Sequence, residues 1–242
     1  MHFGIFQYLH VGLFNTLGYI DMSRRKLEKF AQIKDSDKVL DRSFFYDELG
    51  GRTENTWTTF FGNSNPITLE LGCGYGEYTI GLAQQFPGRN FIGIDVKGDR
   101  LWTGMTRAEE LNLSNVAFIR SEVSRIPTLF HFQQIAELWI PFPDPQPKKQ
   151  HLKLTHPRYI EMYKLVLQEN GLIHLKTDDE ELFNFTKEMV AAHGFFSTQI
   201  DDIYPLNTSF PALNIQTKFE KKWLAEGKTI RYIQFNPSYR GV

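Results

Sequence analysis

The stretch Ile67-Thr68-Leu69-Glu70-Leu71-Gly72-Cys73-Gly74-Tyr75-Gly76-Glu77 decides the fold of this 242-residue chain. An apolar run that contains an acid gives way to glycine at every second position, which predicts a buried strand, a tight turn and the start of a helix. Glycine permits positive φ angles and lets a ligand approach more closely than a Cβ would allow. The start of a helix adds free N–H groups and a positive dipole end. We therefore predict a ligand-binding turn here, with a glycine-rich turn that binds nothing as the alternative.

The glycine spacing argues against a dinucleotide-binding fingerprint and excludes a P-loop. A dinucleotide fingerprint needs glycine three residues after the second glycine, where this chain has Glu77, and no Gly-Lys-Ser/Thr of a P-loop follows. The strand, the acid and Gly-x-Gly-x-Gly together resemble motif I of S-adenosylmethionine-dependent methyltransferases with a Rossmann-like fold. This resemblance implies that Glu70 holds the amino group of the cofactor, S-adenosyl-L-methionine, and that Gly72 and Gly74 lie along its methionine part.

The composition sets the broad class. The net charge is −1 and the pI is about 6.7, so binding to a polyanion would have to come from a local basic patch. The single cysteine, Cys73, excludes an intramolecular disulfide and fits a reducing compartment, which predicts a cytoplasmic protein.

The amino-terminal residues are apolar but match no membrane segment. Residues 1–20 lack the basic start and the cleavage site of a signal peptide, and Gln7, His10 and Asn15 interrupt the apolar run. We therefore expect no membrane partner. A second start, Met22, precedes a basic segment, and we hypothesise that translation begins there. Residues 1–38 are predicted to be a flexible extension and residues 39–242 a single domain.

The rest of the chain alternates between strand and helix patterns. Short apolar runs alternate with segments whose apolar residues recur at helical spacing, as in an α/β fold. Strands are predicted at 67–71, 90–94, 116–120, 136–140, 172–176 and 230–235, and helices at 78–86, 101–111, 160–167 and 182–192. Together with the motif I resemblance, this pattern predicts a Rossmann-like class I methyltransferase fold with a mostly parallel seven-stranded sheet and helices on both faces.

Carboxylates lie in or directly after four of these strands: Glu70, Asp95, Glu122 and Asp144. Ligands of open parallel sheets bind outside the carboxyl ends of the strands. Asp95 lies about 20 residues beyond the glycine turn, where an acid can accept from both ribose hydroxyls. Glu122 resembles the acid that such methyltransferases place beside the adenine amino group. The alternative is that each acid only caps a helix.

A stiff and then basic stretch follows the fourth predicted strand. Phe142-Pro143-Asp144-Pro145 leads into a segment whose cations are Lys148, Lys149, Lys153 and Arg158, with no acid among them. Cations next to an aspartate at the ligand-binding edge suit a phosphate backbone whose base must reach the cofactor. A solvated charged loop is the alternative.

Here the resemblance becomes more specific. The stretch is similar to the Phe-Pro-Asp-Pro-Trp-x-Lys-x-Arg-His signature of tRNA (guanine-N7)-methyltransferases. Thr177-Asp178 resembles that family's Thr-Asp, and Thr217-Lys218-Phe219-Glu220 resembles its guanine-binding box; the likeness spans residues 39–235.

The resemblance implies methyl transfer from S-adenosylmethionine to N7 of a guanine in the variable loop of tRNA, by a monomer or homodimer without a metal. It implies a catalytic role for Asp144, which would also border the cofactor. The implied substrate-binding residues are Lys148, Asp178, Thr217, Lys218, Phe219 and Glu220.

The chain departs from the signature at three places. Gln146 stands where the family has tryptophan, Gln150 where it has arginine, and Leu154-Thr155 where it has further basic residues. Each change removes stacking surface or positive charge from the expected RNA face. The alternatives that stay open are methylation of another RNA atom or of a small molecule, and a non-catalytic RNA-binding subunit that binds S-adenosylmethionine. A third alternative, a nicotinamide-dependent oxidoreductase, is disfavoured by the glycine spacing.

Overall fold

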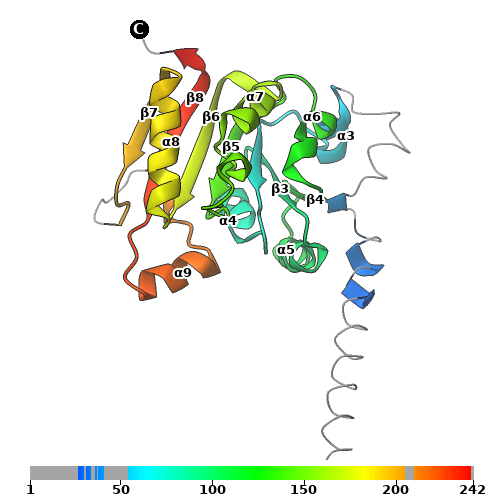
Figure 1. The fold of residues 1–242 in the computed structure, drawn as a ribbon. Coiled ribbons are helices and arrows are strands. Elements are labelled where there is room, and N and C mark those ends of the chain that lie inside the picture. Colours follow the sequence, from blue (N-terminus) through cyan, green and yellow to red (C-terminus); the bar gives the residue numbers. More distant parts are fainter. Residues whose placement is uncertain are drawn as a thin grey trace, which may run out of the picture.

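The computed structural model describes residues 27–29, 31–33, 36, 38–40, 54–204 and 210–240 (Figure 1). The named helices and strands, in chain order, are β1 (Val39–Leu40), α3 (Thr56–Phe61), β2 (Ile67–Leu71), α4 (Glu77–Gln85), β3 (Asn90–Asp95), α5 (Gly98–Glu110), β4 (Val116–Arg120), η1 (Val123–Arg125), α6 (Ile126–Leu129), β5 (Ile135–Pro141), η2 (Gln150–Leu152), α7 (Pro157–Lys164), β6 (Leu167–Thr177), α8 (Glu180–Ala192), β7 (Phe195–Ile200), η3 (Pro211–Asn214), α9 (Lys218–Ala225) and β8 (Arg231–Arg240).

The strands form one sheet in the order β1-β4-β3-β2-β5-β6-β8-β7. Strand β8 runs antiparallel to both of its neighbours, and the other pairings are parallel. The predicted α/β fold with a mostly parallel sheet is confirmed. The described residues contain eight strands rather than seven, because Val39 and Leu40 pair with Phe118 and Ile119 of β4. A two-residue strand is too short to show any alternation in the sequence.

The strand order reverses between β2 and β5. From β2 the chain proceeds through β3 to β4 in one direction, and from β5 through β6 in the other. Such a reversal opens a crevice outside the carboxyl ends of the two central strands, where open α/β sheets bind ligands. The glycine turn follows β2 and the Phe-Pro-Asp-Pro loop begins at the end of β5, so both motifs meet at this crevice.

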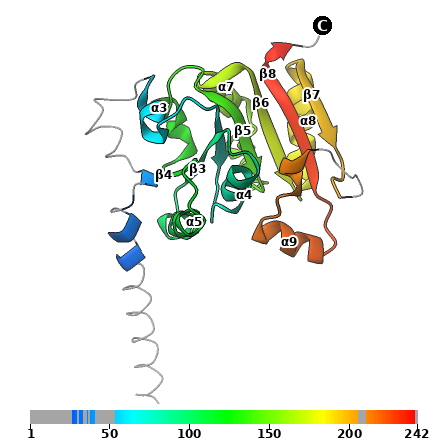
Figure 2. The same cartoon turned by 180° about the vertical axis from the view of Figure 1, so that it is seen from behind.

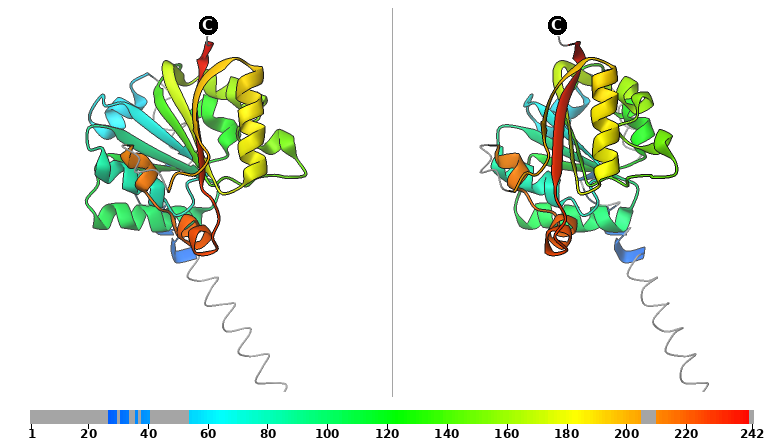
Figure 3. Two further views of the ribbon diagram at one scale, coloured as in Figure 1. Left: turned by 90° about the vertical axis from the view of Figure 1, so that its left-hand side faces the viewer. Right: turned by 60° about the vertical axis from the view of Figure 1, so that its left-hand side comes forward.

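Helices cover both faces of the sheet, as predicted (Figures 2 and 3). One apolar core lies between the sheet and α3, α6, α7 and α8, and the other between the sheet and α4, α5 and η3. All five residues of β2 are buried. A strand buried on both faces reads as a continuous apolar run, which is why β2 was visible in the sequence.

One predicted boundary was wrong. The helix expected at 160–167 ends at Lys164, and β6 begins at Leu167 rather than at Leu172. Ile135 pairs with Leu167 but Glu137 pairs with Leu172, so the register shifts and residues 168–171 form an irregular excursion in β6. Asn170 and Gly171 lie within this excursion, and both residue types are common in bulges as well as in turns.

The described part of the amino-terminal segment contacts α5. Residues 27–29 and 31–33 are helical, and Ile33 is buried. Trp102 Nε1 donates to Gln32 Oε1 at 2.6 Å, and Lys38 Nζ donates to the carbonyl of Leu113 at 2.6 Å. Residues 1–26, with the hypothesised start at Met22, lie outside the described residues. Among the residues described, none of the helices has the length and apolar character needed to cross a membrane.

Candidate active site

The glycine turn has the conformation that its sequence predicts. Gly72, Gly74 and Gly76 have φ angles of 68°, 54° and 72°, in the left-handed region that favours glycine. The N–H of Gly74 donates to Asp95 Oδ2 at 2.9 Å, and the N–H of Lys97 donates to Asp95 Oδ1 at 2.8 Å. The acid after β3 therefore fixes the turn after β2, and this joins two of the predicted cofactor residues.

Glu70 is the buried acid of the site. Its side chain is 3% exposed and accepts a hydrogen bond from Thr79 Oγ1 of α4. Burial raises the pKa of Glu70 from its ordinary value of 4.5 to about 8, and the nearby carboxylates of Asp95 and Glu77 add to the rise. A carboxyl group in this setting gains its charge most readily when a cation binds against it.

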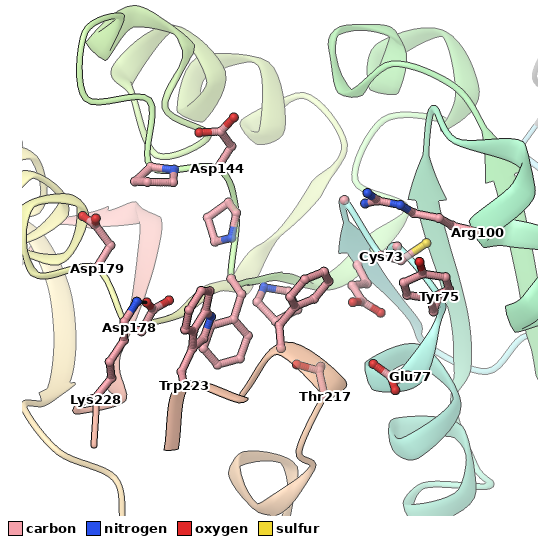
Figure 4. A pocket seen from close by; sticks show the side chains of 18 residues that line it. Cys73, Tyr75, Glu77, Arg100, Asp144, Asp178, Asp179, Thr217, Trp223 and Lys228 are labelled. Atoms are coloured by element: carbon pink, nitrogen blue, oxygen red, sulfur yellow. Dashed lines mark hydrogen bonds and ion pairs between the residues drawn. The ribbon is translucent and has the colours of Figure 1, made fainter. Parts of the chain in front are cut away.

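A cleft of about 460 Å³ lies at the switch point and has two sides (Figure 4). The glycine-turn side presents Cys73, Tyr75, Glu77 and Arg100, and the opposite side presents Asp178, Trp223 and Lys228, with Asp144 and Asp179 at the rim. The lining residues are Glu70, Gly72, Cys73, Gly74, Tyr75, Glu77, Arg100, Pro141, Phe142, Pro143, Asp144, Pro145, Asp178, Asp179, Thr217, Phe219, Trp223 and Lys228.

Asp144 lies on a sharply bent loop. Phe142 and Gln146 have φ angles of 50° and 47°, which bulky residues adopt only under constraint. The N–H of Phe142 donates to the carbonyl of Lys176 at 2.7 Å, and the N–H of Gln146 donates to Asp144 Oδ1 at 3.1 Å. The loop thus holds Asp144 exposed at the cleft, and backbone strain of this kind is common at functional sites.

The basic stretch after Asp144 divides into outward and inward positions. Lys148 and Lys149 are exposed, but Lys153 is fully buried and bonds to Glu181 Oε1 of α8 at 3.1 Å. Counting Lys153 among the cations for a phosphate backbone was therefore wrong, because its ammonium anchors the loop to α8. Thr155 bonds to Thr186 at 2.7 Å and is buried.

Leu154 and Thr155 stand where the family signature has further basic residues. Leu154 packs against the apolar core that contains α7 and α8, next to buried Thr155. These two positions face inward in this chain, so the loop presents its positive charge to solvent mainly through Lys148, Lys149 and Arg158.

The carboxy-terminal motif is split between the cleft and the interior. Thr217 and Phe219 line the cleft, while the N–H of Lys218 donates to Glu77 Oε2 at 2.8 Å and ties α9 to α4. Glu220 is fully buried, and its Oε1 lies 2.7 Å from Lys176 Nζ. The Glu220 carboxylate faces the Lys176 ammonium and is not among the groups that line the cleft. Direct contact of Glu220 with a substrate therefore stays a prediction.

Three further predicted site residues, Asp95, Glu122 and Lys148, are not among the residues that line the cleft. Asp95 is buried behind the glycine turn, Glu122 is exposed at the end of β4 and accepts from Ser124 Oγ at 3.2 Å, and Lys148 is exposed on the loop after β5. Four lining residues, Arg100, Asp179, Trp223 and Lys228, are not among the site residues predicted from the sequence. Arg100 lies apart from the motifs in sequence. Asp179 directly follows Thr177-Asp178, and Trp223 and Lys228 follow the Thr-Lys-Phe-Glu box, so nearness to a motif could have suggested these three.

The cleft is strongly acidic. Among the described residues that line it are the carboxyl groups of Glu70, Glu77, Asp144, Asp178 and Asp179 but only two cations, Arg100 and Lys228. Within the part of the chain that the structure describes, no group of three or more His, Cys, Asp and Glu side chains is placed to hold a metal ion. Such a cleft favours a cationic ligand and a reacting group that becomes positively charged.

Comparisons with known proteins define the class. The family model described as "Putative methyltransferase" matches residues 64–233. The 16S rRNA methyltransferase KamB has the same fold, with a TM-score of 0.58 at 13% identity over 76% of this chain and 93% of that chain. The antibiotic-resistance methyltransferase Kmr gives a TM-score of 0.55 at 16% identity over 79% of this chain and 94% of that chain. The protein is therefore of the methyltransferase class, with a Rossmann-like fold.

Relatives that match most of the chain define the family more specifically. The tRNA (guanine-N(7)-)-methyltransferase of Bacteroides thetaiotaomicron is 40% identical over 226 residues, which cover 91% of this chain and 89% of that protein. The protein of the same name from Porphyromonas gingivalis is 45% identical over 191 residues, 78% of each chain. The chain belongs to the tRNA (guanine-N7)-methyltransferase family, which confirms the resemblance drawn from its motifs.

Proposed function

We propose that the protein transfers the methyl group of S-adenosylmethionine to N7 of a guanine in the variable loop of tRNA. The observation that carries this proposal is the single cleft at the switch point, which unites the glycine turn and Glu70 with Asp144 and Asp178. The named relatives supply the substrate class. A tRNA substrate would place the reaction in the cytoplasm.

The residues present fit the cofactor. A Cβ built on Gly72 would meet no atom within 4 Å, so the turn borders open space rather than a packed neighbour. Glu70 would accept from the cofactor's ammonium group, and Gly72 and Gly74 would leave room for its methionine part. In this proposal Asp95 binds the ribose hydroxyls and Glu122 the adenine amino group. S-adenosylmethionine would supply an electrophilic methyl group on a sulfonium.

The charge distribution explains how an acidic cleft can serve an RNA substrate. Carboxylates in the cleft repel phosphates, so the tRNA backbone would stay outside, against the exposed Lys148, Lys149 and Arg158. A single base would enter the cleft by leaving its stack. Most of the binding energy for tRNA would then come from these exposed cations outside the cleft, and the cleft would select the base.

The chemistry needs positioning more than proton transfer. Guanine N7 carries an in-plane lone pair and no proton at neutral pH, so the protein has no proton to remove before attack. The task of the protein is to hold N7 in line with the methyl group. Because the guanine ring becomes cationic as the N7–C bond forms, a carboxylate beside it lowers the barrier. In this proposal Asp144 supplies that carboxylate, with Asp178 as the second acid.

One assay tests the function and separates the alternatives. Unmodified tRNA would be incubated with the protein and tritium-labelled S-adenosylmethionine, and the product mapped by aniline-induced cleavage. We expect labelled tRNA that is cleaved at a guanine of the variable loop. Label without cleavage would indicate another atom, and absence of label would indicate a non-catalytic subunit; either result contradicts the proposal.

A further inference from the structure

Trp223 places an aromatic face in the substrate side of the cleft. It lies on α9, lines the cleft and is partly exposed, near Asp178 and Lys228 (Figure 4). Of the other three tryptophans, Trp57 and Trp139 are buried in the two cores and Trp102 lies on α5. Trp223 is thus the tryptophan that a molecule entering the cleft would meet.

An ammonium group occupies this aromatic face. Lys228 Nζ lies 3.5 Å from the centroid of the Trp223 ring and 2.7 Å from Asp178 Oδ2. A cation held between an indole face and a carboxylate is bound both by the ring quadrupole and by direct charge attraction. Lys222 Nζ is also near the ring, at 4.5 Å, but it pairs with Glu226 at 3.9 Å and does not line the cleft.

The local backbone fixes this arrangement. Helix α9 ends at Ala225, and Gly227 follows it with a φ of 74°. The N–H groups of Gly227 and Lys228 donate to the carbonyls of Leu224 and Trp223, each at 3.0 Å. This is the Schellman pattern, which reverses the chain at a left-handed glycine. The reversal brings Lys228 back against Trp223, five positions earlier, and this helix cap holds the ammonium over the indole.

We propose that Trp223 stacks on the target guanine and that Lys228 occupies this place until the guanine displaces it. This inference rests on the proposed methylation of guanine N7. The flat base replaces the ammonium on the indole face, and its N1–H and 2-amino group donate to the Asp178 carboxylate that Lys228 releases.

The charge balance of the reaction fits the exchange. When the methyl group moves, its bond to sulfur breaks with the electron pair left on sulfur, and a bond forms to the N7 lone pair. The positive charge passes from the sulfonium to the guanine ring. The methylated ring is then a cation on an aromatic face beside Asp178, which is the environment that holds the Lys228 ammonium in the free protein.

The site therefore predicts preference for a methylated, cationic base. Fluorescence titration of the full chain with 7-methylguanosine 5′-monophosphate should quench Trp223, with affinity on the order of tenfold higher than for guanosine 5′-monophosphate. Lys228→Met removes the competing ammonium and should raise the affinity for both nucleotides severalfold. Lys222→Met makes the same charge change beside the same ring and should leave both affinities unchanged.

The tryptophan itself is tested by two variants. Trp223→Leu should abolish the preference for the methylated nucleotide and raise the KM for tRNA on the order of tenfold. Trp223→Phe should retain most of the preference and a KM close to that of the wild-type protein. A merely structural role for Trp223 would not produce a preference that depends on the charge of the base.

Two results would overturn the inference: a wild-type protein that binds both nucleotides equally, or a Lys228→Met variant that binds them no better. Methyl transfer to tRNA by the wild-type protein is measured alongside. If that transfer occurs while Trp223→Leu keeps a normal KM, the stacking role fails and the proposed function stands; if no transfer occurs, the proposed function fails.

Discussion

The ammonium of Lys176 lies 2.7 Å from Oε1 of Glu220, and both side chains are completely buried. Lys176 also donates to the carbonyls of Leu213 and Ile215 at 2.9 and 3.0 Å, and the hydroxyl of Tyr204 donates to Glu220 at 2.6 Å. Burial lowers the pKa of Lys176, and the Glu220 carboxylate opposes that shift. This network joins β6 to η3 and α9, and it therefore sets where Thr217, on the cleft, comes to lie.

Removing the charge of Glu220 should therefore lower the stability of the folded protein. Glu220→Gln leaves a buried ammonium without its counter-charge, and we expect the free energy of unfolding to fall by about 3–5 kcal/mol. Urea denaturation would measure the change. Glu226→Gln on the same helix is the control, since Glu226 is exposed and its loss should change stability by less than about 0.5 kcal/mol.

The same variant distinguishes two roles of the Thr-Lys-Phe-Glu motif. If Glu220 positions α9, Lys176→Met combined with Glu220→Leu should restore much of the stability, because an apolar pair replaces the ionic one. A Glu220→Gln protein that is as stable as wild type but inactive would instead mean that Glu220 contacts the guanine directly.

The raised pKa of Glu70 predicts a pH dependence of stability. The unfolded chain releases this proton near pH 4.5, whereas the folded protein keeps it to about pH 8. The contribution of Glu70 to the free energy of unfolding is therefore full below pH 4.5 and is lost as the pH rises to 8, at roughly 1.4 kcal/mol per pH unit. Glu70→Gln cannot titrate, so its stability should fall less steeply between pH 5 and 8 when both proteins are unfolded by urea.

Cofactor binding should reverse the protonation of Glu70. An ammonium group against the carboxyl favours its charged form, so binding of S-adenosylhomocysteine near pH 7 should release close to one proton. Titration calorimetry in buffers of different ionisation enthalpy measures this release. Glu70→Gln should bind more weakly and release none; equal proton release by the two proteins would remove Glu70 from the binding site.

The elements that the sequence predicted share a property: their signal is local. Strand β2 is buried on both faces and the turn after it needs positive φ, so apolar residues and glycines reveal both. The short strand β1 depends on pairing with β4, and the bulge in β6 depends on β5, so neither is visible along the chain.

For the site, the sequence shows the type of each residue but not whether its side chain points to solvent or to the interior. Lys148 and Lys153 read alike in a basic loop, yet one is exposed and the other is buried against α8. Likewise Asp178 was identified from its motif, but its partner Lys228 comes from a helix cap 50 residues later. Tertiary packing decides such pairings, and one sequence carries no local trace of them.

Lys148 and Lys153 should differ in their effect on RNA binding. Lys148→Met removes an exposed cation from the rim, so tRNA affinity should fall and the slope of log K against log salt should decrease by about 0.7–0.9. Lys153→Met removes a buried ammonium that pairs with Glu181, and the slope should not change. Binding measured by filter retention over a series of salt concentrations gives both slopes, and equal slope changes would contradict the inward orientation of Lys153.

Asp144 should act on turnover rather than on folding. Its side chain is exposed and accepts one hydrogen bond, from the N–H of Gln146, which an asparagine oxygen can also accept. Asp144→Asn therefore keeps the loop but removes the negative charge beside the guanine ring. We expect kcat to fall on the order of 10²-fold, because the lost interaction stabilises a charge that appears only in the transition state. Single-turnover methyl transfer measures this rate, while calorimetry with S-adenosylhomocysteine should show nearly unchanged affinity and urea unfolding unchanged stability. Full activity of Asp144→Asn would transfer the electrostatic role to Asp178, whose carboxylate is freed when the base displaces Lys228.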